Sequence, residues 1–231
     1  TGRVVWYRKT FFVPAKHKGQ KVFIEFEGAR QAAEVWVNGH WVGLHEDGVM
    51  AFGYDISDYV LFGKKPNVIA VRTDNSWDYK ERATGSTYQW NNKNFNANYG
   101  GLSKNVYLHF TNKLYQTLPL YSNLKTKGVY VYASNMDVSA RIATVNVEAE
   151  VRNEYDKTQN FKLEAFLRDN DKLLIREFQS DEVAIGPGET KTVKATATVK
   201  NINFWSWGYG YLYELTTRLS VGKKIEDIVK T

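Results

Sequence analysis

The fold is decided by the stretch Ala33-Glu34-Val35-Trp36-Val37-Asn38-Gly39-His40-Trp41-Val42. Two runs rich in apolar residues flank Asn38-Gly39, and they show the period of two that is typical of strands. The Asn-Gly pair favours a type I′ turn, because Asn tolerates a positive φ and Gly has no Cβ to clash. The stretch therefore predicts a tight β-hairpin.

The same period runs through the rest of the first half of the chain. In Lys21–Glu27, the spacing places Val22, Ile24 and Phe26 on one face of a strand. The continuous apolar run in Val68–Arg72 predicts a strand that is buried on both faces. We find no amphipathic helix in the sequence beyond one turn around residues 55–60. Little helix over this length predicts an all-β protein built from sandwiches.

A second series of strands follows a stretch with a weaker pattern around residues 115–135. Turn residues at Gly186–Glu189 separate two of its strands. Strands at this spacing over about a hundred residues fit an immunoglobulin-like sandwich. We therefore predict two domains, with the boundary between residues 112 and 129. The predicted strands of the second series are Thr144–Arg152, Phe161–Leu167, Thr190–Val199 and Tyr211–Val221.

The composition excludes several classes of function. The 231 residues include no cysteine, which rules out disulfides, thiolate catalysis and Cys-ligated zinc. The net charge of +6 is spread along the chain rather than clustered, so we expect no nucleic-acid partner. No run of 18 apolar residues occurs, so we expect no membrane partner. The aromatic content of 15% is high, and core packing explains most of it.

A set of short sequence blocks occurs in a fixed order over nearly the whole chain. The blocks are Trp6–Phe11, Val13-Pro14, Phe23–Gly28, Val35–Gly39, Val42-Gly43, Phe52, Asp55-Ile56, Asn67–Arg72, Asp74-Asn75, Gly100–Val106, Phe204–Ser206 and Leu212-Tyr213. No single block is decisive, but the ordered set resembles glycoside hydrolase family 2 of the β-galactosidase type.

The resemblance implies a galactose-binding-like jelly-roll sandwich followed by an immunoglobulin-like β-sandwich. We assign residues 1–114 to the jelly-roll sugar-binding domain, 115–128 to a linker and 129–231 to the immunoglobulin-like domain. Family members continue into a TIM barrel that carries two catalytic glutamates. We therefore expect this chain to be the non-catalytic N-terminal part of such an enzyme, inactive alone. The parent is expected to hydrolyse β-galactosides, and the barrel of the same polypeptide is the expected partner.

Two alternatives to this interpretation remain open. In the first alternative, the chain is a free-standing carbohydrate-binding module. In the second, it is a structural or adhesion pair of sandwiches whose aromatic residues serve only as core. The block Gly100–Val106 resembles the motif that closes the family's sugar-binding domain, and the sequence departs from that closing motif at Lys104, where the family usually carries Arg. Lysine lacks the bidentate fork of arginine, so the carboxylate pairing that the family implies is in doubt at this position.

The candidate site is the long segment between Asp74 and Tyr99. Long loops in compact domains are usually functional or disordered, and aromatic residues argue against disorder. Trp and Tyr rings can stack on sugar faces, while Asn and Asp side chains bond to hydroxyl groups. By resemblance, this loop lines the sugar subsite of the full enzyme. The candidate substrate-binding residues are Asp74, Trp90, Asn92, Asn94, Asn96 and Asn98.

No residue is assigned a catalytic or metal-binding role. Retaining glycosidases need two carboxyl groups about 5–5.5 Å apart, and the sequence does not show that any pair among Glu46, Asp47, Asp74, Asp78 and Glu81 meets this need. His45, Glu46 and Asp47 are adjacent, and on a strand their side chains point to opposite faces.

Trp205 and Trp207 are expected to pack at the sandwich edge or on the barrel, with a sugar platform as the alternative. We expect no cofactor, weak binding of carbohydrate by the chain alone, and a periplasmic or secreted location.

Overall fold

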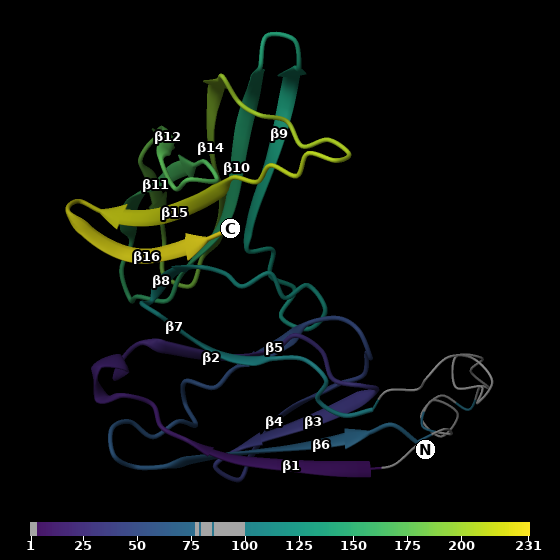
Figure 1. The fold of residues 1–231 in the computed structure, drawn as a ribbon. Helices are drawn as coiled ribbons and strands as arrows, with labels where there is room; N and C mark the ends of the chain where they lie inside the picture. The colour runs from purple at the N-terminus through teal and green to yellow at the C-terminus, as the bar shows by residue number, and fades with distance from the viewer. Residues whose placement is uncertain (1–3, 77–78, 80–84, 86–99) are drawn as a thin grey trace. The chain divides into compact units, whose positions relative to one another are not determined.

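The computed structural model of the chain describes residues 4–76, 79, 85 and 100–231. These residues divide into two units (Figure 1). The first unit comprises residues 1–110 and 120–125, and the second comprises residues 111–119 and 126–231. The short segment 120–125 thus belongs to the first unit although both of its neighbouring segments belong to the second.

The first unit is a sandwich of two antiparallel sheets, as the sequence predicts. One sheet has the strand order β1-β6-β3-β4, and the other has the order β5-β2-β7. Figure 1 shows these sheets as two layers. The described helical structure here includes one 3-10 turn, η1 at Ala15–His17. The strands are β1 (Val4–Phe11), β2 (Lys21–Phe26), β3 (Ala32–Val37), β4 (His40–His45), β5 (Phe52–Asp55), β6 (Asn67–Asp74) and β7 (Val106–Thr111).

The predicted hairpin is confirmed. β3 pairs with β4, and the two residues between them, Asn38 and Gly39, have φ values of 51° and 84°. The Asn38 side chain also ties the turn to the neighbouring strand, because its Nδ2 donates to Asn67 Oδ1 at 2.8 Å. On β2, Val22, Ile24 and Phe26 are buried as the alternation predicts. These side chains belong to the core between the two sheets.

The prediction that Val68–Arg72 is buried on both faces is wrong. On one face of β6, Val71 is buried and Ile69 packs against the core. On the other face, Val68 and Ala70 are only half-buried and line an open groove. An apolar run shows that a strand tolerates burial on both faces, but it does not show that a second layer of structure covers the outer one.

The second unit is the immunoglobulin-like sandwich. In one sheet, β10 pairs with β14 along one edge and with β8 and β9 along the other. In the second sheet the order is β12-β11-β15-β16, and β13 also pairs with β11. The strands are β8 (Leu114–Gln116), β9 (Val129–Asp137), β10 (Ile142–Asn153), β11 (Gln159–Arg168), β12 (Leu174–Gln179), β13 (Val183–Ile185), β14 (Thr190–Lys200), β15 (Glu214–Val221) and β16 (Lys224–Lys230).

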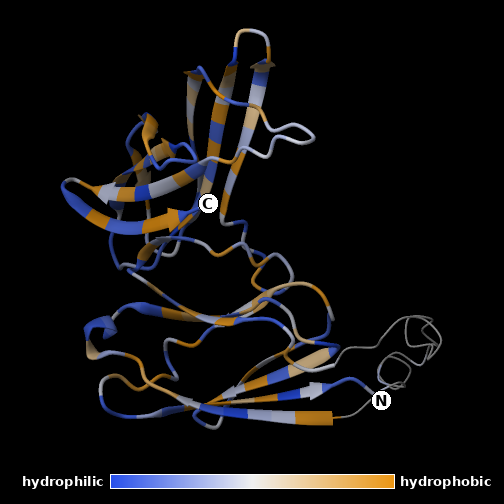
Figure 2. Ribbon diagram, viewed as in Figure 1, coloured by the Kyte–Doolittle hydropathy of each residue, from blue (hydrophilic) through white to orange (hydrophobic). Residues whose placement is uncertain are grey.

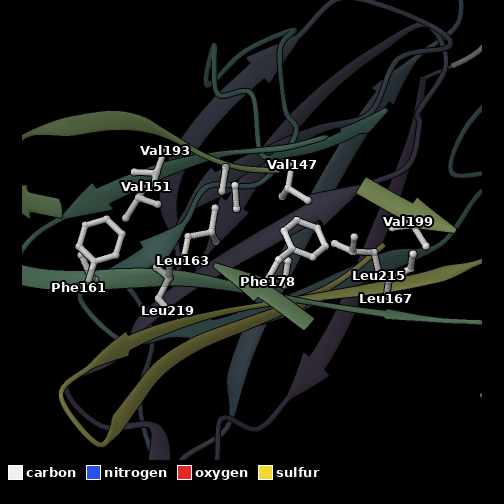
Figure 3. Packing of buried hydrophobic residues seen from close by; sticks show 14 of the residues in the cluster. Val147, Val151, Phe161, Leu163, Leu167, Phe178, Val193, Val199, Leu215 and Leu219 are labelled. Carbon is white, nitrogen blue, oxygen red and sulfur yellow. The ribbon is translucent and has the colours of Figure 1, made fainter. Parts of the chain in front are cut away.

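The core of the second unit lies between its two sheets. Figure 2 shows hydrophilic and hydrophobic residues alternating along β10, and Val147 and Val151 on that strand are fully buried. Figure 3 shows Val151 on the side of Phe161 and Leu163 of β11, and Val147 close to Phe178 of β12; with Leu219 of β15 they belong to one cluster. The alternation read from Thr144–Arg152 and Phe161–Leu167 is therefore confirmed, because one face of each strand packs into a single apolar core.

Candidate functional site

The described part of the candidate site includes the two chain segments that flank residues 77–99 in the sequence. We call these segments, Asp74–Ser76 and Gly100-Gly101, the loop base. Asp74 ends β6 and lies in register between Val4 of β1 and Ala32 of β3. Its side chain is therefore held in the middle of a sheet, and the residue is only 2% exposed.

The Asp74 carboxylate is fully engaged in holding the start of the loop. Its Oδ1 accepts hydrogen bonds from the backbone N–H of Ser76 at 3.0 Å and from the Ser76 hydroxyl at 2.5 Å. Its Oδ2 accepts from Arg72 Nη2 at 3.2 Å, and Arg72 Nη1 donates to Glu34 at 2.8 Å. The carboxylates of Glu34 and Asp74 thus flank one guanidinium. This arrangement is that of a structural ion network that fixes the strand end.

The other end of the loop base is shaped by two glycines. Gly101 forms an isolated bridge with Arg30, with N–O distances of 2.9 and 3.1 Å. Its φ is +87°, and the Tyr7 hydroxyl occupies the space that a Cβ would need. A Cβ on Gly100 would lie 2.6 Å from Nδ2 of Asn75. Gly100 thus lies close to Asn75, and a Cβ at either glycine would require the Asn75 or Tyr7 side chain to move.

The His45-Glu46-Asp47 stretch does not gather around one point. His45 is 7% exposed and stacks on Phe52, with ring centroids 4.2 Å apart. Burial lowers the pKa of His45, although Asp47 and Glu46 oppose that shift. Asp47 accepts hydrogen bonds from the backbone N–H groups of two residues in the following turn. Among the described residues, no group of three His, Asp or Glu side chains is arranged to hold a metal ion.

Glu46 contacts the described part of the loop itself. The hydroxyl of Tyr79 donates to Glu46 Oε1 at 2.6 Å. Burial raises the pKa of Tyr79, and the hydrogen bond to Glu46 adds to the shift. Tyr79 is therefore a neutral donor at ordinary pH, and Glu46 serves to anchor the loop.

Lys104 follows the loop base in the closing motif. Its aliphatic stem lies over Gly28, where a Cβ would be 3.4 Å from Cδ of the lysine. Within the described parts of the chain, no carboxylate pairs with its ammonium group. Asn105 holds the same region instead, through hydrogen bonds from its N–H and Nδ2 to Glu27 Oε2 at 3.2 and 3.0 Å.

Of the predicted substrate-binding residues, only Asp74 falls within the described structure. Trp90, Asn92, Asn94, Asn96 and Asn98 lie outside the described residues. The carboxyl groups of Asp78 and Glu81 also lie outside them. The structure therefore describes the loop base on either side of the predicted sugar-contacting segment in the sequence, and it gives Asp74 an anchoring role there.

The aromatic segment near the end of the chain forms a tight turn rather than a strand. Ser206 and Tyr209 exchange two backbone hydrogen bonds of 3.0 and 2.9 Å, with Trp207 and Gly208 between them. Trp205 and Trp207 are 66% and 95% exposed. The predicted strand at Tyr211–Val221 begins later, at Glu214. The tryptophans thus project from a turn of the second unit.

Comparison with known protein families decides the identity of the two units. Residues 1–112 match the sugar-binding domain of glycosyl hydrolases family 2, and residues 129–231 match a second domain model of the same family. The chain belongs to glycosyl hydrolase family 2. The two family 2 domains follow each other in the order that the sequence predicts.

The family 2 relatives are much longer proteins. The chain is 37% identical to a β-glucuronidase of Formosa agariphila over 96% of its own length, but it spans only 22% of that protein. It is 29% identical to a β-galactosidase of Bacteroides ovatus, of which it spans 24%. The chain thus spans about a quarter of the length of these curated relatives, and it corresponds to their N-terminal part.

Solved structures show the same two family 2 domains. A β-glucuronidase from glycoside hydrolase family 2 matches 99% of the chain with a TM-score of 0.90 and 35% identity, and the match covers 23% of that structure. A family 2 member from Bacteroides cellulosilyticus matches 98% of the chain with a TM-score of 0.81 and 28% identity, covering 28% of that structure.

The described helical segments include none that is long and apolar enough to cross a membrane.

Proposed function

We propose that this chain is the non-catalytic front of a family 2 β-glycosidase, which supports a downstream catalytic barrel and lines one side of its sugar pocket. The observation that carries the proposal is the tandem match of both units to family 2 domain models, in a chain that spans only 22% of a relative named β-glucuronidase. The remaining length of such relatives provides room for a catalytic domain.

The substrate of the whole protein is a β-linked glycoside. The names of the similar proteins divide between β-glucuronidase and β-galactosidase. The sequence alone favours a β-galactoside, whereas the relative with 37% identity is named for glucuronides. Hydrolysis of the 4-nitrophenyl β-galactoside and β-glucuronide by the full-length protein separates these two substrates.

The exposed aromatic turn supports a partner inside the same polypeptide. Trp207 is 95% exposed and Leu212 is 70% exposed, which is unusual for large apolar side chains so close together. We assign this turn to contact with the downstream barrel. Burial of a large aromatic side chain contributes about 1.5–3 kcal/mol, so a contact of this kind holds the immunoglobulin-like domain against its neighbour.

The sugar-lining role belongs to the loop between the two segments of the loop base. The network around Asp74 and the close approach of Gly100 to Asn75 fix both ends of this loop. Fixed ends reduce the conformational freedom that a loop loses when it contacts substrate. We propose that at least one of Asn92, Asn94, Asn96 and Asn98 donates or accepts a hydrogen bond to the bound sugar.

An alanine scan of these four asparagines in the full-length enzyme tests the proposal. Loss of one neutral hydrogen bond costs about 0.5–1.5 kcal/mol, or up to roughly a tenfold decrease in kcat/KM. If the bond strengthens in the transition state, the loss appears in kcat as well as in KM. Asn160→Ala, at an exposed position of β11, is the control. Four folded variants with unchanged kcat/KM would show that the loop does not contact substrate.

A further inference from the structure

The outer face of the sheet β1-β6-β3-β4 carries a pair of tryptophans that the loop site does not use. Trp6 of β1 and Trp36 of β3 lie on either side of β6, and their ring centroids are 5.2 Å apart with an interplanar angle of 33°. They approach each other over Ala70, which pairs in register with Trp36. The two rings are in contact with each other there, so a ligand would meet their outer faces rather than a space between them.

Together these residues form an open groove, which we call the tryptophan groove. Its volume is about 320 Å³, near the lower end of the range of roughly 300–1,000 Å³ for small-ligand sites. The smaller residues Gly39, Val68 and Ala70 form the floor of the groove, and the larger side chains stand above them. The groove is lined by Trp6, Arg8, Trp36, Gly39, Val68 and Ala70.

A single cation of the groove is left without an ionic partner. Arg72, on the neighbouring strand, donates to both Glu34 and Asp74. Arg8 lies two residues from Trp6 on the same strand, and it is exposed. In the part of the chain that the structure describes, its guanidinium has no hydrogen bond or ion pair. Its planar fork is suited to a carboxylate, which it can bind through two parallel hydrogen bonds.

We propose that the tryptophan groove binds one pyranose unit of an acidic oligosaccharide, with a uronate carboxylate on Arg8. The apolar C–H face of the sugar ring stacks on Trp6 or Trp36, whose flat faces suit such contacts. Trp41 continues the aromatic surface, because it pairs with Trp36 across the hairpin and is 57% exposed. A single unpaired cation beside the two rings favours a single carboxylate over a polyanion, which needs several cations in a row.

The proposal is independent of the loop and of the catalytic barrel. Every lining residue belongs to the first unit, and none lies in the segment 77–99. The groove therefore adds an accessory saccharide site to whatever pocket the full enzyme builds. Such a site holds an acidic polysaccharide near the enzyme through a second contact, which raises the effective concentration of substrate.

Calorimetric titration of the 231-residue chain tests the groove directly. The probe is a β-1,4-linked glucuronate tetrasaccharide, and the neutral β-1,4-linked glucose tetrasaccharide is the comparison. We expect millimolar or tighter binding of the acidic probe and weaker binding of the neutral one. Trp6→Ala should raise the dissociation constant for the acidic probe by about tenfold or more, since a desolvated aromatic anchor contributes at least that much to affinity. Arg8→Gln should remove the preference for the acidic probe.

Matched variants separate the groove from general effects. Trp207→Ala removes a still more exposed tryptophan from the second unit, 95% against 59% for Trp6, and it should leave binding unchanged. Trp6→Phe keeps a flat ring and should retain most of the affinity. Absence of binding by the unmodified chain, or equal losses for Trp6→Ala and Trp207→Ala, would overturn the proposal. So would a Trp6→Ala effect confined to self-association of the chain, or binding of single-stranded oligonucleotides but of neither saccharide.

Discussion

At the scale of single residues, some buried polar side chains stabilise the fold and take no part in the candidate site. Asn153 ends β10 with no exposed surface. Its Nδ2 lies 2.9–3.1 Å from the carbonyl oxygens of Lys157, Ile185 and Gly186, which share its two hydrogens, and its Oδ1 accepts from the N–H of Tyr155 at 2.9 Å. One amide thus satisfies several backbone groups where three segments of the second unit meet.

Replacing this amide should destabilise the second unit. Asn153→Ala leaves buried N–H and carbonyl groups without partners, so we expect the free energy of unfolding to fall by about 3 kcal/mol. Urea unfolding measures the change. Asn160→Ala, an exposed change on the neighbouring strand, should alter it by less than about 0.5 kcal/mol. Equal effects of the two substitutions would show that the hydrogen bonds of Asn153 contribute little.

His45 gives the first unit a pH-dependent stability. Burial lowers its folded pKa below the usual 6.5, so the unfolded chain binds more protons between these two values. The stability that neutral His45 contributes is therefore complete above about pH 6.5. It is lost as the pH falls from about 6.5 through the folded pKa of His45. We expect unfolding of the unmodified chain to become easier at about pH 5 than at about pH 7.5.

His45→Leu should remove this part of the pH dependence, because leucine keeps the site apolar and does not titrate. His40→Leu is the control, since His40 is exposed on the same strand. Hydrogen exchange of the β3 and β4 amides at the two pH values reports on the first unit alone. A pH dependence that survives His45→Leu undiminished would assign it to other groups.

At the scale of elements, local chemistry explains which predictions succeed. The Asn38-Gly39 hairpin is predictable because both positive φ values are a property of those two residues. The outer face of β6 is not, because the exposure of Val68 depends on whether another layer covers the sheet. The start of β15 at Glu214 is also not visible in the sequence, because the apolar pattern continues back to Tyr211; the Tyr213 hydroxyl there accepts from the N–H of Asn203 at 2.7 Å.

The base of the candidate site is a further element whose geometry the sequence does not show. Gly100-Gly101 is visible as a turn signal, but its reason is the contact of Gly101 with Tyr7 and of Gly100 with Asn75. These contacts join segments that are far apart in the sequence. The role of Asp74 is hidden for the same reason, since its anchoring depends on Arg72 and on the register with β1 and β3.

Gly101→Ala should destabilise the first unit for two separable reasons. The φ of +87° disfavours any Cβ by about 1 kcal/mol, and overlap with the Tyr7 hydroxyl adds about 1–3 kcal/mol. Gly188→Ala in the second unit isolates the first effect, because its φ is +69° and a Cβ there meets open space. Urea unfolding should show a larger decrease in the free energy of unfolding for Gly101→Ala in the first unit than for Gly188→Ala in the second. Adding Tyr7→Leu to the Gly101→Ala chain should reduce that decrease. Equal losses would show that the contact with Tyr7 is easily relieved.

At the scale of the whole molecule, the order of the two sandwiches is what the sequence predicts best. Period-two patterns and turn residues are spread over the entire chain, so errors at single strands do not change the architecture. The loop base and the tryptophan groove are less visible in the sequence, because each depends on side chains brought together from β1, β3 and β6. The tryptophan groove shows the difference. Trp6, Arg8 and Trp36 are all visible in the sequence, but only the register across β6 places them around one space.

The chain alone should not hydrolyse aryl β-glycosides. Retaining hydrolysis needs a nucleophile and an acid/base about 5–5.5 Å apart, and the structure gives Glu46 and Asp74 other tasks. Glu46 accepts from the Tyr79 hydroxyl, and Asp74 accepts from Ser76 and Arg72. We expect no turnover of the 4-nitrophenyl β-galactoside or β-glucuronide by the purified 231-residue chain, measured beside the full-length protein as the positive control. Turnover that persists through purification and is abolished by Asp74→Asn, Asp78→Asn or Glu81→Gln, in variants that still fold, would place a catalytic pair within this chain and contradict its assignment as a non-catalytic front.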